Sequence, residues 1–204
     1  MGERKTYHRG RRKKKKGGII STLILIIAIA VFCVSGYQLY KIFGGYHQGK
    51  SEYDKVREVA VHGDDKDEDE FVVDFDELKK INADTVGWIR FYPEPSQISY
   101  PLVQTTDNDL YLNRTFSANE NTVGAIFVNC DNASDFSDRN TIIYGHRMRD
   151  HSMFHDLEKY KDESFWKENP YFYIYTPDGR KLTCHIYSAG IVKDTSSTYL
   201  TQFA

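Results

Sequence analysis

The side chain best placed for chemistry follows a short β-branched run. Thr141–Ile143 is typical of a strand, and Tyr144, Gly145 and His146 follow where that strand should end. A strand end of this kind presents one imidazole to a cleft. Histidine titrates near neutral pH and commonly acts as an acid or base beside a nucleophile. His146 is therefore the candidate catalytic residue.

The three cysteines are poorly placed to be its nucleophile. Cys33 lies in an apolar run, Cys130 in a polar turn, and Cys184 in the middle of an expected strand. A reactive thiol needs partial exposure and a neighbour that stabilises its thiolate. We expect packing or turn roles for Cys130 and Cys184, and a bridge between them is compatible with the sequence. So few cysteines do not make a disulfide scaffold.

Metal binding is the competing use of the histidines. His151 and His155 are one helical turn apart and follow His146 closely. No acidic or cysteine ligand stands beside them at a recognised spacing, and the glutamate of a zinc-protease helix is absent. We therefore expect no metal and no cofactor, with His151 and His155 facing solvent.

Several short elements must position His146. Asp74 should cap a helix over 75–82. Strands are expected over 86–91, 98–103, 124–128 and 141–144, a helix over 153–169, and a hairpin over 171–192 that turns at 177–179. Pro101 suggests that its strand lies at an edge or carries a bulge. Many short strands with small helices favour a mixed barrel over a βαβ sheet.

Charge and hydropathy divide the first 70 residues into three parts. Residues 1–18 form a basic arm with nine of the 27 lysines and arginines and one of the 29 acids, which leaves a net charge of −10 on the remainder. Residues 19–43 include an uncharged run from Ile19 to Tyr40, about 33 Å long as a helix and enough to cross a bilayer. Residues 44–70 read as an acidic solvated linker, with a weak helical pattern over 52–61. Its acids lack the spacing of a calcium loop.

The basic flank predicts a single-pass signal anchor, with the N-terminus in the cytoplasm and a folded domain, residues 71–204, outside. A cleaved signal peptide is the alternative, but the apolar run is long and has no clear cleavage site. Basic arms also bind nucleic acid. Because this arm directly adjoins the apolar run, we expect a membrane-orienting role and no nucleic-acid partner.

Six segments of the domain form a pattern when they are read together: LKKINADTVGWI at 78–89, YPLVQ at 100–104, DNDLYL at 107–112, TIIYGH at 141–146, MF at 153–154 and YSA at 187–189. Taken together, these segments resemble a class B sortase. The resemblance extends from about Phe71 to Phe203 with little interruption, so it is more specific than any one motif.

Sortases are cysteine transpeptidases of Gram-positive cell surfaces. The resemblance implies a mixed, mainly-β fold: a closed or partly open β-barrel with short helices, behind one transmembrane helix. It also implies cleavage of an Asn-Pro-x-Thr-x sorting signal through a thioacyl intermediate, which an amine of the peptidoglycan precursor resolves. The implied partners are surface proteins that bear this signal, and the implied location is the cell membrane.

The resemblance assigns roles to five residues. His146 matches the family histidine, which protonates the leaving amine and activates the incoming one. Asn108, Tyr144, Tyr199 and Leu200 match positions that contact the signal peptide. The family also has a cysteine in a Thr-Leu-x-Thr-Cys pattern and an arginine on the next strand, and neither is matched in these 204 residues.

This mismatch leaves three interpretations. The sequence is a fragment of an active transpeptidase, or it is an inactive remnant or peptide-binding module that lacks the nucleophile. In the second case, the barrel would have an open edge and the domain would be poorly stable. In the third, the basic arm signals in the cytoplasm and the outer domain only senses peptide.

Overall fold

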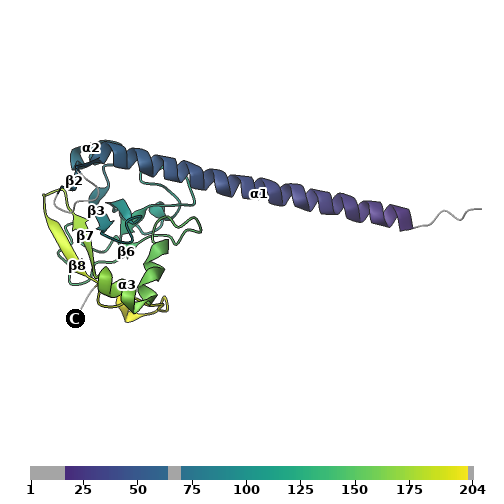
Figure 1. The fold of residues 1–204 in the computed structure, drawn as a ribbon. Helices are drawn as coiled ribbons and strands as arrows, with labels where there is room; N and C mark the ends of the chain where they lie inside the picture. The colour runs from purple at the N-terminus through teal and green to yellow at the C-terminus, as the bar shows by residue number, and fades with distance from the viewer. Residues whose placement is uncertain (1–16, 64–69, 202–204) are drawn as a thin grey trace, which may run out of the picture. The chain divides into compact units, whose positions relative to one another are not determined.

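The computed structural model describes residues 17–63 and 70–201, in two compact units that divide between Phe43 and Gly44. Helix α1 (Gly17–Ala60) contributes to both units (Figure 1). In the first unit, the large apolar side chains from Ile19 to Phe43 are exposed around the helix, as in a helix that lipid surrounds. Within the described ranges it is the one helix long and apolar enough to cross a membrane. The basic arm before it lies outside the described residues.

The second part of α1 belongs to the core of the second unit. Tyr53, Val56 and Ala60 are buried and recur at helical spacing, so one face of the helix packs on the domain. The Tyr53 hydroxyl donates a hydrogen bond to the Gly124 carbonyl at 2.8 Å. Residues 44–60 therefore form a packed helix where a solvated linker was expected. Charged residues between the buried positions conceal this narrow apolar stripe in the sequence.

Two short strands and a helix follow α1. Strand β1 (Val61–His62) pairs antiparallel with β2 (Val72–Val73), and the acidic segment 64–69 between them lies outside the described residues. Helix α2 (Phe75–Ile81) begins as predicted, because the Asp74 carboxylate accepts the Glu77 N–H at 3.0 Å.

A six-stranded sheet forms the frame of the domain. Its strands are β3 (Thr85–Phe91), β4 (Ser99–Val103), β5 (Ile126–Val128), β6 (Ile143–Tyr144), β7 (Tyr171–Tyr175) and β8 (Lys181–His185). The order is β6-β5-β4-β3-β7-β8, and neighbours are antiparallel except for the parallel pair β4–β5. The sheet is curled like a half-barrel, with β6 and β8 at its edges in the described part of the chain (Figure 1). The prediction of a mainly-β, partly open barrel with short helices is confirmed.

Of the two positions that Pro101 suggested, an edge strand or a bulge, the edge is wrong because β4 is an interior strand. The β3–β4 pair does have a register shift, which lies on β3 between Thr85 and Gly87. Pro101 pairs with Trp88 of β3 on one side. On the other side β5 pairs only with Leu102 and Val103. Proline lacks the N–H that a second partner would require, and this short overlap leaves Pro101 with a single partner strand.

The segment 153–169 differs from the single helix expected there. It forms the 3₁₀ helix η2 (His155–Lys161) and the short helix α3 (Glu163–Glu168). Asp162 separates them, since its carboxylate accepts the Ser164 N–H and caps α3. The β7–β8 hairpin turns at Gly179 as predicted, with φ +83°, but β8 ends at His185 instead of Val192.

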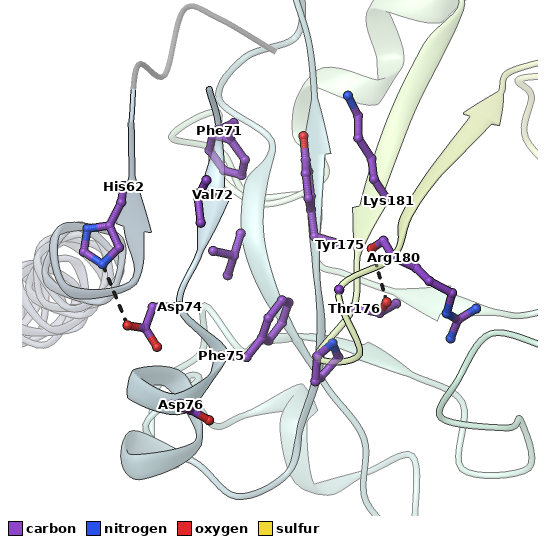
Figure 2. A pocket seen from close by; sticks show the side chains of 13 residues that line it. His62, Phe71, Val72, Asp74, Phe75, Asp76, Tyr175, Thr176, Arg180 and Lys181 are labelled. Atoms are coloured by element: carbon purple, nitrogen blue, oxygen red, sulfur yellow. Dashed lines mark hydrogen bonds and ion pairs between the residues drawn. The ribbon is translucent and has the colours of Figure 1, made fainter. Parts of the chain in front are cut away.

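A cavity of about 640 Å³ lies on the β7–β8 side of the domain. Figure 2 shows Phe71, Val72 and Phe75 on one wall and Tyr175 and Thr176 facing them. Its lining residues come from β1, β2, the start of α2 and the β7–β8 turn. None of them belongs to β5, β6 or the segment that carries His146.

Candidate active site around His146

The end of β6 positions His146 as the sequence predicted. β6 pairs antiparallel with β5, and the chain then turns at Gly145. A Cβ atom at position 145 would lie 2.6 Å from the ring of Phe154, so only glycine fits there without displacement. The backbone returns to this point, because the Phe154 N–H donates to the His146 carbonyl at 2.9 Å. His146 therefore lies on a short, internally bonded loop.

Two backbone groups fix the imidazole of His146. Its Nε2 donates to the Leu112 carbonyl at 2.6 Å. The Cδ2 atom of the ring lies against Gly124, where an added Cβ would be 2.8 Å from it. A carbonyl oxygen only accepts, so the proton of the neutral ring is on Nε2 and Nδ1 carries the lone pair. The ring can thus take up and return a proton at Nδ1.

Tyr144 is the last residue of β6 and lies two residues before His146. Its ring packs against Phe127 of β5, with centroids 5.1 Å apart. The side-chain amide of Asn129 donates to the Tyr144 hydroxyl at 3.0 Å. This hydrogen bond joins the strand to the loop that follows β5.

Asn108 is joined to the same loop. Its Oδ1 accepts the Cys130 N–H at 2.9 Å, one residue from the Asn129 that binds Tyr144. The Asn108 carbonyl oxygen is therefore engaged in holding the loop.

Tyr199 and Leu200 are held near the start of β6. The 3₁₀ helix η3 (Ser197–Tyr199) ends at Tyr199, and the Asn140 amide donates to the carbonyls of Thr198 (3.0 Å) and Leu200 (2.8 Å). The two side chains are 43% and 51% exposed, so their apolar surface is open to a ligand. Hydrogen bonds thus place Asn108, Tyr199 and Leu200 at the Val128–Ile143 end of the β5–β6 pair, whereas His146 extends from the opposite end.

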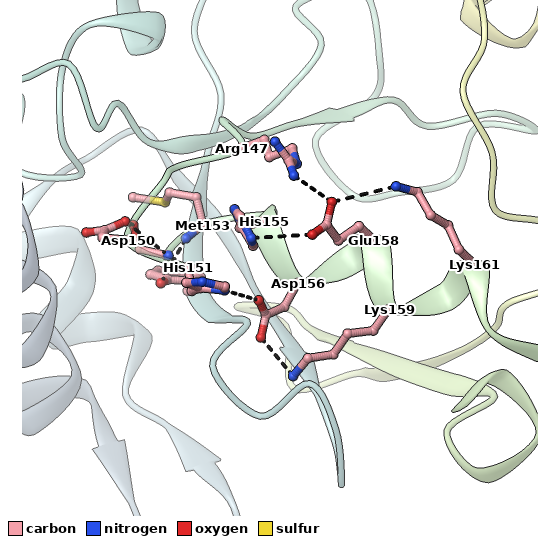
Figure 3. A network of polar contacts seen from close by, with 11 residues as sticks. Arg147, Asp150, His151, Met153, His155, Asp156, Glu158, Lys159 and Lys161 are labelled. Carbon is pink, nitrogen blue, oxygen red and sulfur yellow. Dashed lines mark hydrogen bonds and ion pairs between the residues drawn. The ribbon is translucent and has the colours of Figure 1, made fainter. Parts of the chain in front are cut away.

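Of the two arginines next to His146, Arg147 is bound to a carboxylate and Arg149 is exposed. Arg147 binds Glu158, with Nη2 2.5 Å from Oε2, and this hydrogen bond lowers the pKa of Glu158 below its ordinary value. Figure 3 shows Arg147 and Lys161 both directed at that carboxylate.

Neither cysteine of the domain stands beside His146. Cys130 lies beyond the Val128–Ile143 end of the β5–β6 pair, whereas His146 lies beyond the opposite end. Cys184 is on β8, at the other edge of the sheet order, and burial raises the pKa of its thiol. Both are free thiols in the structure. A raised pKa opposes thiolate formation, which does not favour Cys184 as a nucleophile.

Four further residues build the site and were not predicted from the sequence. Gly124 and the Leu112 carbonyl hold the imidazole, and Asn129 and Asn140 hold the neighbouring loops. The φ of Gly124 is +67°, a conformation that favours glycine. A glycine just before the apolar run 125–128 was the one local signal available, since a carbonyl acceptor leaves no trace in side-chain type.

No family model matches the chain. It is 35% identical over 155 residues to sortase B of Listeria monocytogenes and 30% identical over 148 residues to sortase B of Staphylococcus aureus. Each match covers 72% of this chain and 60% of the relative, so the chain spans less than two thirds of these curated relatives.

Solved structures of sortase B also match the fold of this chain. The chain matches sortase B from B. anthracis in complex with AAEK1 with a TM-score of 0.63 and 32% identity, covering 76% of each chain. It matches the S. aureus sortase B–substrate complex with a TM-score of 0.59 and 32% identity, over 63% of this chain and 58% of that one.

Proposed function

Because this chain belongs to the class B sortase family, we propose that it carries the histidine of a membrane-anchored cysteine transpeptidase that joins surface proteins to the cell wall. The observation that carries the proposal is the placement of His146. Its ring is fixed at the end of β6 with Nδ1 unprotonated in the neutral form. An imidazole held in one tautomer is what general acid–base chemistry on an amide requires.

In the proposed reaction, a thiolate attacks the Thr carbonyl of an Asn-Pro-x-Thr-x sorting signal. His146, protonated at Nδ1, gives its proton to the amine that leaves, and a thioester forms. An amine of the peptidoglycan precursor then attacks the thioester. His146 takes the proton of that amine, the new amide forms, and the thiolate is released. We assign the thiolate to neither Cys130 nor Cys184.

The signal peptide would lie against the surfaces beside β6. Tyr199 and Leu200 offer exposed apolar surface, and Tyr144 contributes its ring edge and hydroxyl. Since the Asn108 oxygen already accepts the Cys130 N–H, its amide N–H groups are the part that would donate to a peptide carbonyl.

The apolar part of α1 supports the location. We propose that residues 19–43 span the membrane once, with the basic arm in the cytoplasm and the domain outside, where its acceptor amine is found.

The test uses the protein in its own membrane. After its intact mass has been compared with the 23.7 kDa of this sequence, it is given a fluorogenic Asn-Pro-x-Thr-x peptide with and without an amine acceptor. We expect thiol-dependent cleavage and ligation, and we expect H146A to reduce the rate by about 10²-fold or more. Full activity in H146A would refute the assignment.

A peptide-binding module is the second candidate, and the remoteness of Cys130 and Cys184 from the His146 end of β6 favours it. In that case the labelled peptide binds, with binding weakened by L200A, but is never cleaved. Cleavage at a rate above that of the free peptide would eliminate this candidate.

A further inference from the structure

The segment that follows His146 gathers two histidines and a carboxylate. His151 lies in the loop before η2, and His155 and Asp156 are the first two residues of η2. One potential ligand atom from each lies within 4.8 Å of the other two. Figure 3 shows the three side chains together, with His151 Nδ1 3.2 Å from Asp156 Oδ1. The ring centroids of the two histidines are 4.1 Å apart.

His155 has an unused ring nitrogen inside the protein. The residue is 8% exposed, and its Nε2 faces Glu158 Oε1 at 3.6 Å. Its buried Nδ1 has no hydrogen-bond partner among the residues that the structure describes. An unpaired buried polar atom is costly. A histidine that binds a metal through one nitrogen usually presents the other to a carboxylate, as His155 presents Nε2 to Glu158.

We propose that His151, His155 and Asp156 bind a divalent transition-metal ion of the zinc type. Two imidazoles and a carboxylate suit such an ion and leave a fourth position for water. Two ligands about 2.0 Å from a tetrahedral ion are roughly 3.3 Å apart. The 3.2 Å between His151 Nδ1 and Asp156 Oδ1 already meets this requirement.

The separation between His151 and His155 can close by a movement of His151, which lies on the solvent side. The His151 side chain is 69% exposed, so it can shift toward His155 without disturbing the core, and it gives the ion a path of entry. Asp156 is fixed from below by Lys159, whose Nζ is 2.9 Å from Oδ2, which leaves Oδ1 for the ion.

The surrounding charges do not oppose a cation. Glu158 lies behind His155, and its own positive partners, Arg147 and Lys161, bind its other oxygen. Asp150 precedes His151 and accepts from Ser152. The three carboxylates Asp150, Asp156 and Glu158 thus match the three positive charges of Arg147, Lys159 and Lys161.

An ion at this position would tie down the loop that returns to His146. Phe154, next to His155, donates its N–H to the His146 carbonyl, and Arg147 forms an isolated bridge with Met153. The prediction that His151 and His155 both face solvent is wrong for His155, which is buried. Asp156 was not predicted as a ligand, because it stands at no familiar spacing from His151. The chain reversal between them brings the two together.

The test measures metal binding by the full, untagged chain in detergent after it has been stripped with a chelator. Co²⁺ is the spectroscopic probe and Zn²⁺ the competitor. We expect about one Co²⁺ per chain, intense visible absorption from a four-coordinate ion, and displacement by Zn²⁺. Affinity should fall at least tenfold in H151A and in D156N, and H185A, an exposed histidine on β8, is the matched control.

H151A is the deciding variant, because that exposed side chain is not needed for folding. If H151A binds Co²⁺ as tightly as the wild type, or if H185A loses as much affinity as H151A, the site is refuted. The absence of saturable binding to the folded wild-type chain would refute it equally.

Discussion

At the scale of single residues, the imidazole of His146 is held between a carbonyl and a glycine. The Leu112 carbonyl accepts a hydrogen bond from Nε2, and the missing side chain of Gly124 leaves the space that the Cδ2 edge of the ring occupies. The position of the ring therefore depends on the absence of a Cβ atom at Gly124 as much as on any side chain. Two predictions follow from these contacts.

Replacing Gly124 with alanine should destabilise the domain and displace His146. The added Cβ would lie 2.8 Å from the His146 ring and 2.9 Å from the Leu112 carbonyl, at a φ of +67°. The backbone conformation alone costs about 1–3 kcal/mol. G179A is the matched control, since Gly179 has a φ of +83° but open space around its Cβ position. Urea midpoints should show a larger loss for G124A, and equal losses would contradict the predicted clash.

The tautomer of His146 is a second prediction. Because Leu112 accepts from Nε2, a long-range ¹H–¹⁵N spectrum at high pH should show a protonated Nε2 and an unprotonated Nδ1. A proton on Nδ1 in the neutral ring would contradict the hydrogen bond and the proposed direction of proton transfer.

At the scale of elements, residues 44–60 of α1 support the loops that hold His146. Tyr53 donates to the carbonyl of Gly124, the residue on which His146 rests, and accepts the Phe116 N–H at 3.2 Å. Glu52, one residue earlier, binds the loop at Ser117 and Asn119. Gly124 thus contacts both the helix, through Tyr53, and the His146 ring.

Tyr53 should therefore be sensitive to loss of its hydroxyl. Y53F would leave the Gly124 carbonyl and the Phe116 N–H buried and unpaired, at a cost of about 1–3 kcal/mol. Y187F is the control, since that side chain is 91% exposed. Denaturant unfolding measures the difference, and an unchanged midpoint in Y53F would show that this contact does not support the domain.

Glu52 should make the docking of α1 sensitive to acid. Burial tends to raise its pKa, but hydrogen bonds from Thr115, Asn119 and Ser117 outweigh it, so the folded pKa lies below the ordinary 4.5. Its contribution to stability is present above pH 4.5 and disappears as the pH falls through the folded pKa.

The measurement is the urea midpoint between pH 6 and pH 3 for the wild type and E52Q. E52Q should be less stable at pH 6 and should lose less stability on acidification. E58Q, on the exposed side of the same helix, serves as the control. Parallel curves for the wild type and E52Q would contradict the assignment.

At the scale of the whole molecule, a basic arm, an apolar helix and a mainly-β domain follow one another along the chain. We predict that protease added outside intact cells removes the domain and spares an N-terminal fragment containing residues 1–43. The physical reason is the positive charge of the arm, which disfavours its export. A chain that is protected throughout, or an arm that is cut first, would overturn this orientation.

Local chemistry determined much of this protein. The Asp74 cap, the Pro-Asp-Gly turn and the strand that ends two residues before His146 each depend on residues close in sequence, so their patterns were readable. The length of residues 19–40 and their lack of charge likewise indicated a membrane helix without reference to any fold.

Tertiary structure decided what depended on distant partners. Residues 44–60 are part of the core because the Tyr53 hydroxyl donates to the Gly124 carbonyl, 71 positions away. Asn108 and Asn140 bind backbone groups of other loops, and Asn129 binds the Tyr144 hydroxyl. The 3₁₀ turn of η2 and the loop before it brought Asp156 to His151. Such contacts arise from chain reversal and the packing of whole elements, and no local spacing encodes them.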